Sequence, residues 1–547
     1  MTTDLALSVM PQIGDLDHQE QSTLNVLMRQ MAAKWPRNEL RARYHDGKNV
    51  LRSLGVAIPP EIAEKTETVV GWPEKAVEGL AHRIRHDGFV IPGESAEDMG
   101  INDMWSANRM DLEAPQAQIS AFIHACAFLA TTQGDVQSGE PDVLITARSA
   151  LSGTGIWDPR RRRLSAALSI VAFDESFPAD QRVTELVMYL PDKVVTVRRA
   201  AGRWWTERRA HSLGRVPVEL LPYRPRLDRP FGQSRISRAV MSITDEAVRT
   251  VLRTEISAEF FAGPQRYILG AEPEAFEDAT GRQRTGWESV IGRILAIGRD
   301  EDGELPTVGT FAQMSFQPHL EHMRSIAMRF AGATNLSVGT LGVVTDNPSS
   351  AEAIHANKEE LLIEAENAAS VFGHAYCNAI RTGVQIRQRL DKAPPELAKL
   401  RVKWRDPATP SRQAASDSVL KVVQAFPWMA DSEVALEQLG WDETTIARAM
   451  ADKRRAAGAG VLGKLTEAAA QRAEQAAPAA APPAAADPAE EANALKAKFD
   501  ALGVAIRAGV KPEDAARRLG LDGIEFTGAT PASLRLPESQ AADLEER

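Results

Sequence analysis

Cysteine is nearly absent from this chain of 547 residues, which contains only Cys126 and Cys377. Two thiols are too few for a disulfide framework or a cysteine-based zinc site, so we expect an intracellular protein. No apolar run approaches the ~20 residues that a membrane-spanning helix needs. The first residues, MTTDLALSVMPQIGD, lack the basic and apolar regions of a secretory signal peptide. We therefore expect a protein that is neither inserted in a membrane nor secreted.

An excess of positive charge is also lacking. Lys and Arg number 64 against 74 Asp and Glu, which gives a formal net charge of −10. Proteins that hold DNA tightly neutralise its phosphates with basic side chains, so this balance does not favour a DNA clamp. Aromatic residues reach only 6%, whereas the hydrophobic fraction of 44% is ordinary for globular proteins. The length predicts two to four structural units.

Three stretches imitate enzyme motifs without the residues that the chemistry requires. GAGVLGKLT at 458–466 has the spacing of a P-loop, but Leu465 stands where Ser or Thr would bind magnesium. HLEHM places His319 and His322 in neither metalloprotease pattern. The glycine-rich segment 336–349 contains no Lys or Arg to clamp a phosphate. We predict no catalytic residue, no metal ligand and no cofactor.

Two basic stretches could meet nucleic acid, DPRRRR at 158–163 and RRAAGRWWTERR at 198–209. Arginine beside tryptophan can stack on bases, and direct DNA contact stays open as an alternative. Both stretches lie at turns between β-branched or aromatic runs. We therefore favour solvated arginines, with either Trp204 or Trp205 packed inward.

The N-terminal part changes its hydrophobic period along the chain. Residues 17–46 carry apolar side chains at helical spacing, and so does the stretch from Ile119 to Cys126. From about 141 to 230, short β-branched runs are separated by Asp-Pro, Pro-Asp and Ala-Gly dipeptides, which predicts antiparallel strands. Helices followed by strands indicate an α+β domain.

Long helices dominate the middle of the chain. One helix is predicted over 234–262, and a second opens after Pro318. A third runs from Ser349 to about Leu390, and Ser349 with Glu352 forms a capping box at its start. The glycine-rich segment thus joins the second helix to the third.

The order of these elements resembles that of the portal (head–tail connector) proteins of tailed bacteriophages, of the siphophage type found in phages of actinobacteria. HSLGRVPVELLPYRPRLDRPFGQSRIS is similar to a family segment, H-G-x-G-x-V-P-V and then a G-x-S helix start, with Leu213 where Gly is often seen. AEFFAGPQRYILG resembles the passage from the first stem helix into the clip. DNPSSAEAI resembles the helix start after the tunnel loop, and VKWRDPATPSRQAASDSVLK the passage into the crown. The tail, IRAGVKPEDAARRLGLDGIEFTG, is also similar.

The resemblance implies an α+β portal fold with an α/β wing, a two-helix stem, a small α/β clip, a long kinked helix and a helical crown, in a ring-forming oligomer. The implied boundaries are: wing, 1–230; first stem helix, 231–262; clip, 263–316; second stem helix, 317–335; tunnel loop, 336–349; long wing helix, 350–392; crown and helical C-terminal region, 393–475; Ala/Pro linker, 476–489; C-terminal helical tail, 490–547.

The resemblance also assigns roles to individual residues. The tunnel loop would face DNA with a smooth lip made of Leu341, Val343, Val344, Thr345, Asp346 and Asn347. Ser349 and Glu352 would cap the helix that follows. The clip would dock the terminase and later the adaptor, and the residues expected there are Gln265, Arg266, Trp287 and Arg293.

The implied function is that of a portal at one capsid vertex, which serves genome packaging, retention and ejection and has no enzymatic activity of its own. The expected partners are further copies of the chain in a cyclic oligomer (twelve in the virion), the terminase large subunit, a head–tail adaptor, and the major capsid and scaffolding proteins. Genomic double-stranded DNA would pass without sequence specificity. The expected location is the virion, and the host cytoplasm during assembly. Two alternatives stay open, a nucleic-acid-processing enzyme and a cellular helical scaffold.

Overall fold

The computed structural model describes residues 13–49, 68–92, 99–174, 176, 182–200, 202–261, 266–269, 307–310, 315–343, 351–408, 412–442, 444–456, 458, 466, 468, 488–507, 510–521 and 523. The chain divides into two compact units, Met1–Thr409 and Pro410–Arg547, which are described one at a time.

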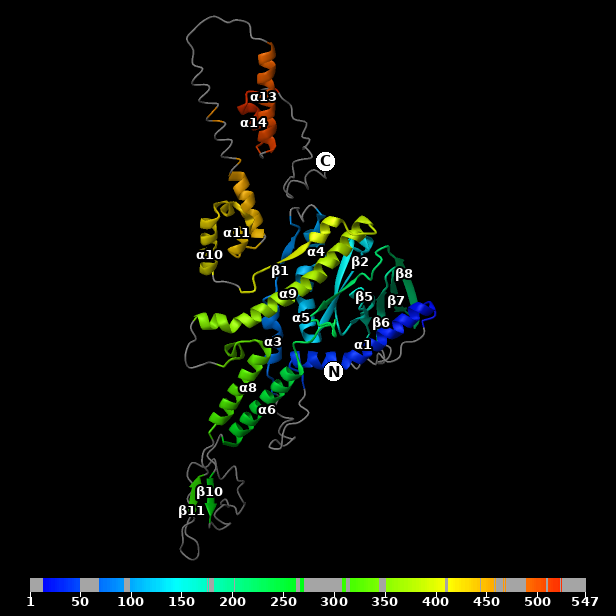
Figure 1. Ribbon diagram of the computed structural model, residues 1–547, viewed down its shortest axis with the longest axis vertical. Helices are drawn as coiled ribbons and strands as arrows, with labels where there is room; N and C mark the ends of the chain where they lie inside the picture. The colour runs from blue at the N-terminus through cyan, green and yellow to red at the C-terminus, as the bar shows by residue number, and fades with distance from the viewer. Residues whose placement is uncertain are drawn as a thin grey trace, which may run out of the picture. The chain divides into compact units, whose positions relative to one another are not determined.

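The two largest antiparallel sheets of the first unit contain the strands that the alternating pattern after residue 141 predicts, together with one strand before it (Figure 1). The five-stranded sheet follows chain order and contains β4 (Gly153–Asp158), β5 (Arg163–Phe173), β6 (Val183–Tyr189), β7 (Lys193–Ala200) and β8 (Arg203–Ala210). The three-stranded sheet has the order β3-β2-β9 and contains β2 (Cys126–Gln133), β3 (Val143–Ser149) and β9 (Val218–Pro222). Each connection within the larger sheet is a hairpin, so its order follows from the turns between the strands.

Strand β2 shows how the layers are stacked. Ala127 and Leu129 point into the largest hydrophobic core, among helices, whereas Cys126 and Phe128 pack toward the five-stranded sheet. This alternation is the period of two that an extended strand imposes on its side chains. Because both faces are covered, nearly every residue of β2 is buried.

Helix α1 (His18–His45) covers the other face of the five-stranded sheet. Leu24, Leu27 and Met31 of the helix meet strand residues in one apolar cluster. Trp204 packs against this cluster, whereas Trp205 on the same strand is 62% exposed. The prediction that one of the two tryptophans faces inward is therefore confirmed.

The largest core is built around α9, a helix of 38 residues from Ala351 to Gln388. Phe372, Tyr376 and Ile380 are buried on one face, as their helical spacing predicts. The helix is unbroken over its whole length. The kink expected in this helix remains a prediction.

Short elements complete this core. They are α3 (Trp72–Ala81), β1 (His86–Val90), α4 (Ile101–Ala107), α5 (Met110–His124), the 3₁₀ helix η6 (Pro395–Lys399) and β12 (Arg401–Trp404), which pairs with β1. A further 3₁₀ helix, η2 (Val136–Ser138), lies between β2 and β3. The helix expected to continue from Ile119 to Cys126 ends at His124, because Ala125 adopts a left-handed conformation with φ 89° and Cys126 begins β2.

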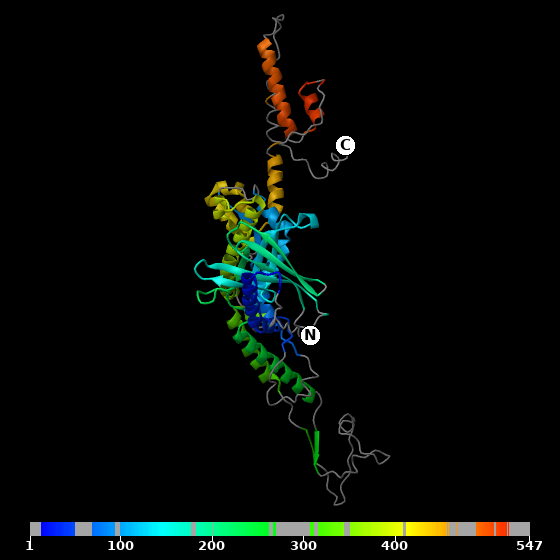
Figure 2. The same cartoon turned by 90° about the vertical axis from the view of Figure 1, so that its right-hand side faces the viewer.

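Helices α6 (Arg238–Phe261) and α8 (Gln317–Thr334) lie side by side (Figures 1 and 2). The first of them starts later than the expected Ser234, because Ser237 caps it by accepting a hydrogen bond from the amide of Val240 at 3.3 Å. Between them in sequence, β10 (Arg266–Leu269) and β11 (Thr307–Thr310) form a two-stranded antiparallel sheet.

The second unit is helical in its described residues. It contains α10 (Arg412–Ala425), the 3₁₀ helix η7 (Pro427–Asp431), α11 (Glu433–Gln438), helical residues 444–456, α13 (Pro488–Arg507) and α14 (Pro512–Arg518). Helices α13 and α14 share a small core of Leu502, Ala515, Ala516 and Leu521. None of the described helices combines the length and the apolar composition that crossing a bilayer requires.

Candidate functional site

The segment GQSR at 232–235 forms a tight passage between β9 and α6. Gly232 has φ +76°, and a Cβ atom there would lie 2.3 Å from the carbonyl oxygen of Tyr223, so no other residue fits without a shift of the backbone. The amide of Gln233 donates to that same carbonyl oxygen at 2.7 Å. The passage is thereby held against the end of β9.

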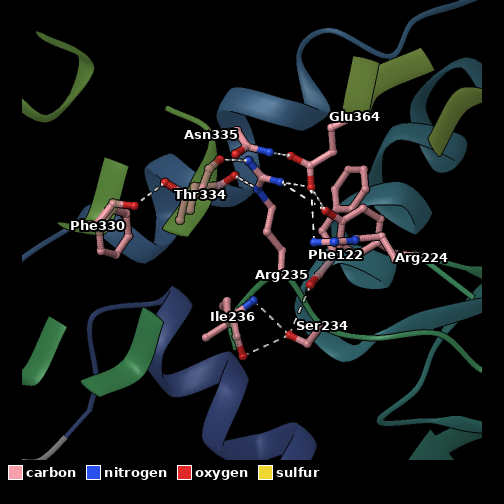
Figure 3. A network of polar contacts seen from close by, with 11 residues as sticks. Phe122, Arg224, Ser234, Arg235, Ile236, Phe330, Thr334, Asn335 and Glu364 are labelled. Atoms are coloured by element: carbon pink, nitrogen blue, oxygen red, sulfur yellow. Dashed lines mark hydrogen bonds and ion pairs between the residues drawn. The ribbon is translucent and has the colours of Figure 1, made fainter. Parts of the chain in front are cut away.

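Ser234 fixes the next step of the passage. Its hydroxyl donates to the carbonyl oxygen of Ile123 at 2.5 Å and accepts a hydrogen bond from the amide of Ile236 at 3.0 Å. The amide of Arg235 donates to the carbonyl oxygen of Phe122 at 2.8 Å. These bonds use the carbonyl groups that the end of α5 leaves without helical partners. They also aim the side chain of Arg235 into the core (Figure 3).

The guanidinium group of Arg235 joins four parts of the chain, and its side chain is only 3% exposed. It forms an ion pair with Glu364 of α9, with Nη1 and Oε1 2.6 Å apart, and donates to the hydroxyl of Tyr223 at 3.1 Å. It also donates to the carbonyl oxygen of Ala76 in α3. A further bond reaches the carbonyl oxygen of Thr334, the last residue of α8 (Figure 3). We call this network the Arg235 junction.

Glu364 completes the junction. It accepts hydrogen bonds from the hydroxyl of Tyr223 and from Asn335 Nδ2, the latter at 3.1 Å. Burial alone would raise the pKa of Glu364, but the charge and hydrogen bonds of Arg235 outweigh it and hold that pKa below its ordinary value. Burial, together with the nearby Glu364, raises the pKa of Tyr223 to about 12, so its phenol stays protonated and able to donate.

The first half of the glycine-rich segment is packed against the body. Asn335 ends α8 in a left-handed conformation with φ 56°, and the 3₁₀ helix η5 (Val338–Leu341) follows. Leu336 and Leu341 are buried in the largest core, and Val343 packs against it. The root of the segment is therefore anchored.

This packing corrects the expectation that Leu341 would present its side chain to DNA. That side chain is 8% exposed and lies among core residues, because the turn of η5 rotates it toward the body. Val343 also contacts the core, so its side chain is only partly exposed for contact with DNA. These two residues anchor the loop.

The other predicted site residues are not described in full. Glu352 lies in α9 and Arg266 in β10. The rest lie outside the described residues, namely Val344, Thr345, Asp346, Asn347, Ser349, Gln265, Trp287 and Arg293. Their roles stay predictions.

The helix pair carries balanced charge. Arginines and carboxylates are equal in number on α6 and α8: Arg238, Arg249, Arg253, Arg324 and Arg329 against Asp245, Glu246, Glu255, Glu259 and Glu321. Glu246 of α6 accepts from Arg329 Nη1 of α8 at 2.9 Å, and His322 Nε2 lies 3.7 Å from the same carboxylate. The described residues hold no group of three or more potential metal ligands.

Sequence reasoning missed the pairing of Arg235 with Glu364. The G-x-S pattern marked the segment that holds Arg235, but α9 also bears Glu359, Glu360 and Glu366 within two turns. Spacing alone does not select Glu364 among them. An arginine shortly before an amphipathic helix was the available signal, since such a residue needs a buried partner if it points inward.

The first unit thus combines an α+β body with a pair of helices, which the buried junction joins to that body. Residues 24–459 match the family described as "Phage portal protein, SPP1 Gp6-like", and the chain belongs to this family. It is 30% identical over 435 residues to the portal protein of Mycobacterium phage L5, which covers 78% of this chain and 87% of that protein. The portal protein of Mycobacterium phage D29 is 29% identical over 433 residues, with the same coverage.

Solved structures are also similar. The neck of a native gene transfer agent particle, computed with C12 symmetry, has a chain with 13% identity and a TM-score of 0.38, covering 70% of this chain and 93% of that one. The neck of the empty particle, computed with C6 symmetry, gives 13% identity, a TM-score of 0.39, and coverages of 70% and 94%. At these scores the likeness carries no further conclusion.

Family membership settles the main alternatives. The chain is a phage portal protein, a structural head–tail connector and not an enzyme. A nucleic-acid-processing enzyme and a cellular scaffold are both wrong as descriptions of it.

Proposed function

We propose that copies of this chain close into a ring, with twelve subunits in the virion, through which genomic double-stranded DNA enters and leaves the capsid at one vertex. Neighbouring subunits meet head-to-tail, since heterologous contacts of this kind close into rings. The Arg235 junction is the observation that carries this proposal. It ties the helix pair, the root of the loop and α9 into one piece, which a channel wall under load requires.

The paired helices serve as the channel wall. The 24 residues of α6 make about 36 Å of helix. B-DNA carries one charge per ~1.7 Å of axis, so such a wall faces about 21 phosphates. A basic wall would bind them tightly by counterion release. The balanced charge of the pair favours a sleeve past which DNA slides without sequence specificity.

The loop forms the lip of the channel beyond its anchored root. Because Leu341 and Val343 contact the core, we limit the DNA-facing part to Val344, Thr345, Asp346 and Asn347. Ser349 caps α9, with Glu352 as the reciprocal acceptor. The glycines before this part allow sharp turns without Cβ clashes.

The clip, residues 263–316, docks the packaging machinery. The terminase large subunit binds there during packaging, through Gln265, Arg266, Trp287 and Arg293, and a head–tail adaptor replaces it afterwards. Assembly in the host cytoplasm brings the ring together with the scaffolding and major capsid proteins. Its place in the finished virion is the portal vertex.

Electron microscopy of the purified protein tests the ring. We expect particles with a central bore wide enough for a duplex, and monomers or closed discs would refute the proposal. The lip is tested by replacing residues 344–347 with Gly-Ser-Gly-Ser, which should leave the rings intact while packaged DNA leaks out. Leu341→Ala is the matched control. It should instead lower the stability of the subunit by about 2–5 kcal/mol, because it empties a core position.

A further inference from the structure

A recess of about 440 Å³ runs along one face of α9. Its floor is made of small buried residues one turn apart, Ala365, Ala369, Gly373 and Cys377. From Ala365 to Arg381 this face extends through about 24 Å of helix. The recess is therefore elongated and shallow-floored, and its volume lies in the range of ligand-binding clefts.

Tryptophan and arginine side chains form its walls. A Cβ atom on Gly373 would lie 3.3 Å from Trp404 Nε1, so the glycine allows the indole of β12 to lie close against α9. Arg83 follows α3, Arg381 stands on α9, and Arg401 belongs to β12. Three separate segments thus contribute arginines to the lining of one recess.

Among the described residues, the hydrogen-bond partners of these three arginines are uncharged oxygens, so their positive charge is not neutralised there. Arg83 Nη1 donates to the carbonyl oxygen of Pro407 at 2.9 Å. Arg381 Nε donates to the carbonyl oxygen of Leu397 at 2.8 Å, and Arg401 Nη1 to that of Leu400 at 2.9 Å.

The remaining charges of the lining are few. Arg83 Nε is buried without a hydrogen-bond partner among the described residues, which is costly for a charged group. Glu366 is the acidic residue of the lining, whereas Arg405 at its edge is already paired with Asp87 at 3.2 Å. The lining of the recess therefore has an excess of positive charge.

The floor remains uncharged. Burial raises the pKa of the Cys377 thiol, although Arg381 and Arg401 oppose this shift. The thiol is consequently protonated and acts as a small apolar group beside Ala369 and Gly373. An apolar floor beneath cationic walls suits a ligand that has both carboxylates and apolar side chains.

We propose that this recess binds an extended acidic segment of a partner protein. Its carboxylates would pair with Arg83 and Arg401, and an apolar side chain would rest on the floor next to Trp404. A duplex presents its phosphates on a convex surface, which does not reach guanidinium groups on the walls of a recess. A single phosphate ion would leave most of the volume and the apolar floor unused. The proposal does not depend on the ring or the loop.

Fluorescence anisotropy with the full-length protein tests it. The probe is a labelled hexapeptide of alternating Glu and Leu, and its counterpart with Lys for Glu is the control peptide. We expect the acidic peptide alone to bind, and Arg401→Gln to weaken it about tenfold, because a charged hydrogen bond is lost. Arg160→Gln, which changes an exposed arginine at the β4–β5 turn, should leave binding unchanged.

A second variant avoids any loss of internal bonds. Ser370 is exposed at the rim of the recess, so Ser370→Glu should repel the acidic peptide while the thermal midpoint stays at the wild-type value. The proposal is overturned if the peptide fails to bind, or if neither variant weakens it. It is equally overturned if sodium phosphate, compared with chloride at equal ionic strength, displaces the peptide and itself depends on Arg401. Binding of a labelled 20-base-pair duplex with that same dependence would assign the site to nucleic acid instead.

Discussion

Glu20 and Glu364 are two largely buried carboxylates, and their surroundings differ. Glu20, at the start of α1, is 1% exposed and pairs with Lys193 and Arg208, each at 2.7 Å. It also accepts from the amide of Asp17 at 3.0 Å, as part of a capping box. Both cations lie on neighbouring strands, and both reach solvent. We call this set the Glu20 cluster.

The Arg235 junction reverses that arrangement. Its cation is sealed, and the same guanidinium serves the backbone of α3 and α8 as well as Glu364. If an ion pair at the Glu20 cluster breaks, Lys193 or Arg208 turns to water. If the junction breaks, several buried acceptors lose their donor at once. The comparison shows that a buried carboxylate can connect one helix to two neighbouring strands through partly exposed cations, or can share one buried cation with several helices.

Removing the buried cation should have the largest effect. Arg235→Met leaves Glu364 charged without its buried cation and removes the guanidinium donor from the carbonyl oxygen of Thr334, which ends α8 and has no helical partner. We expect a loss of about 3–5 kcal/mol in the free energy of unfolding, measured from the urea midpoint by circular dichroism. Arg224→Gln is the matched control, because Arg224 lies 3.9 Å from the same carboxylate but is 68% exposed. Equal losses in the two variants would contradict the distinction.

The backbone of the junction offers a second test, in which Gly232 is compared with Gly202 at the β7–β8 turn. Gly232 and Gly202 both have φ +76°, but a Cβ atom at Gly202 would meet nothing within 4 Å. Gly202→Ala should cost about 1 kcal/mol from the left-handed conformation alone. Gly232→Ala should cost about 2–4 kcal/mol, because the new methyl group also collides with Tyr223. Thermal unfolding measures both, and a similar midpoint for the two variants would show that the passage can relax.

The Glu20 cluster should respond to pH in a defined direction. Hydrogen bonding by Arg208, with help from Lys193, outweighs burial and lowers the pKa of Glu20 from 4.5 to about 2. A lowered pKa in the folded state stabilises the protein above the ordinary value, and this contribution is lost as the pH falls from about 4.5 to about 2.

Glu20→Gln should therefore cost about 2 kcal/mol at pH 7, once the partial exposure of both cations is allowed for. Urea midpoints of the variant and the wild type should converge between pH 4.5 and pH 2.5. A difference that stays constant over this range would mean that the variant loses only the capping hydrogen bond with the amide of Asp17, and that the ion pairs contribute nothing.

Much of the fold could be predicted because the spacing of apolar residues differs between helices and strands. The buried stripe of α9 through Phe372 and Tyr376 follows from helical spacing, and the strands after residue 141 from alternation. Spacing failed at Cys126, because an apolar run continues from α5 into β2 and a left-handed Ala125 separates them. A single residue in a left-handed conformation leaves no trace in the hydrophobic pattern.

The candidate site was less predictable, for a physical reason. Ser234 has the chemistry of a helix cap, but its hydroxyl is used by the carbonyl oxygen of Ile123, and Ser237 caps α6 instead. Leu341 stands among glycines, where no period tells inside from outside. Both outcomes depend on segments more than 100 positions away or on the turn of η5, so only the assembled fold decides them.

The ion pair between the two paired helices should matter least. Arg329 and Glu246 approach to 2.9 Å, but their side chains are 53% and 26% exposed. Water screens the pair and competes for both groups, so Glu246→Gln should change the free energy of unfolding by less than about 1 kcal/mol, and 0.5 M salt should remove even that difference. The helices are held instead by buried residues such as Val240 and Phe330, and by the junction at their base. A loss comparable to that of Arg235→Met would show that the pair is fastened along its length, and that the Arg235 junction is not the joint that we infer.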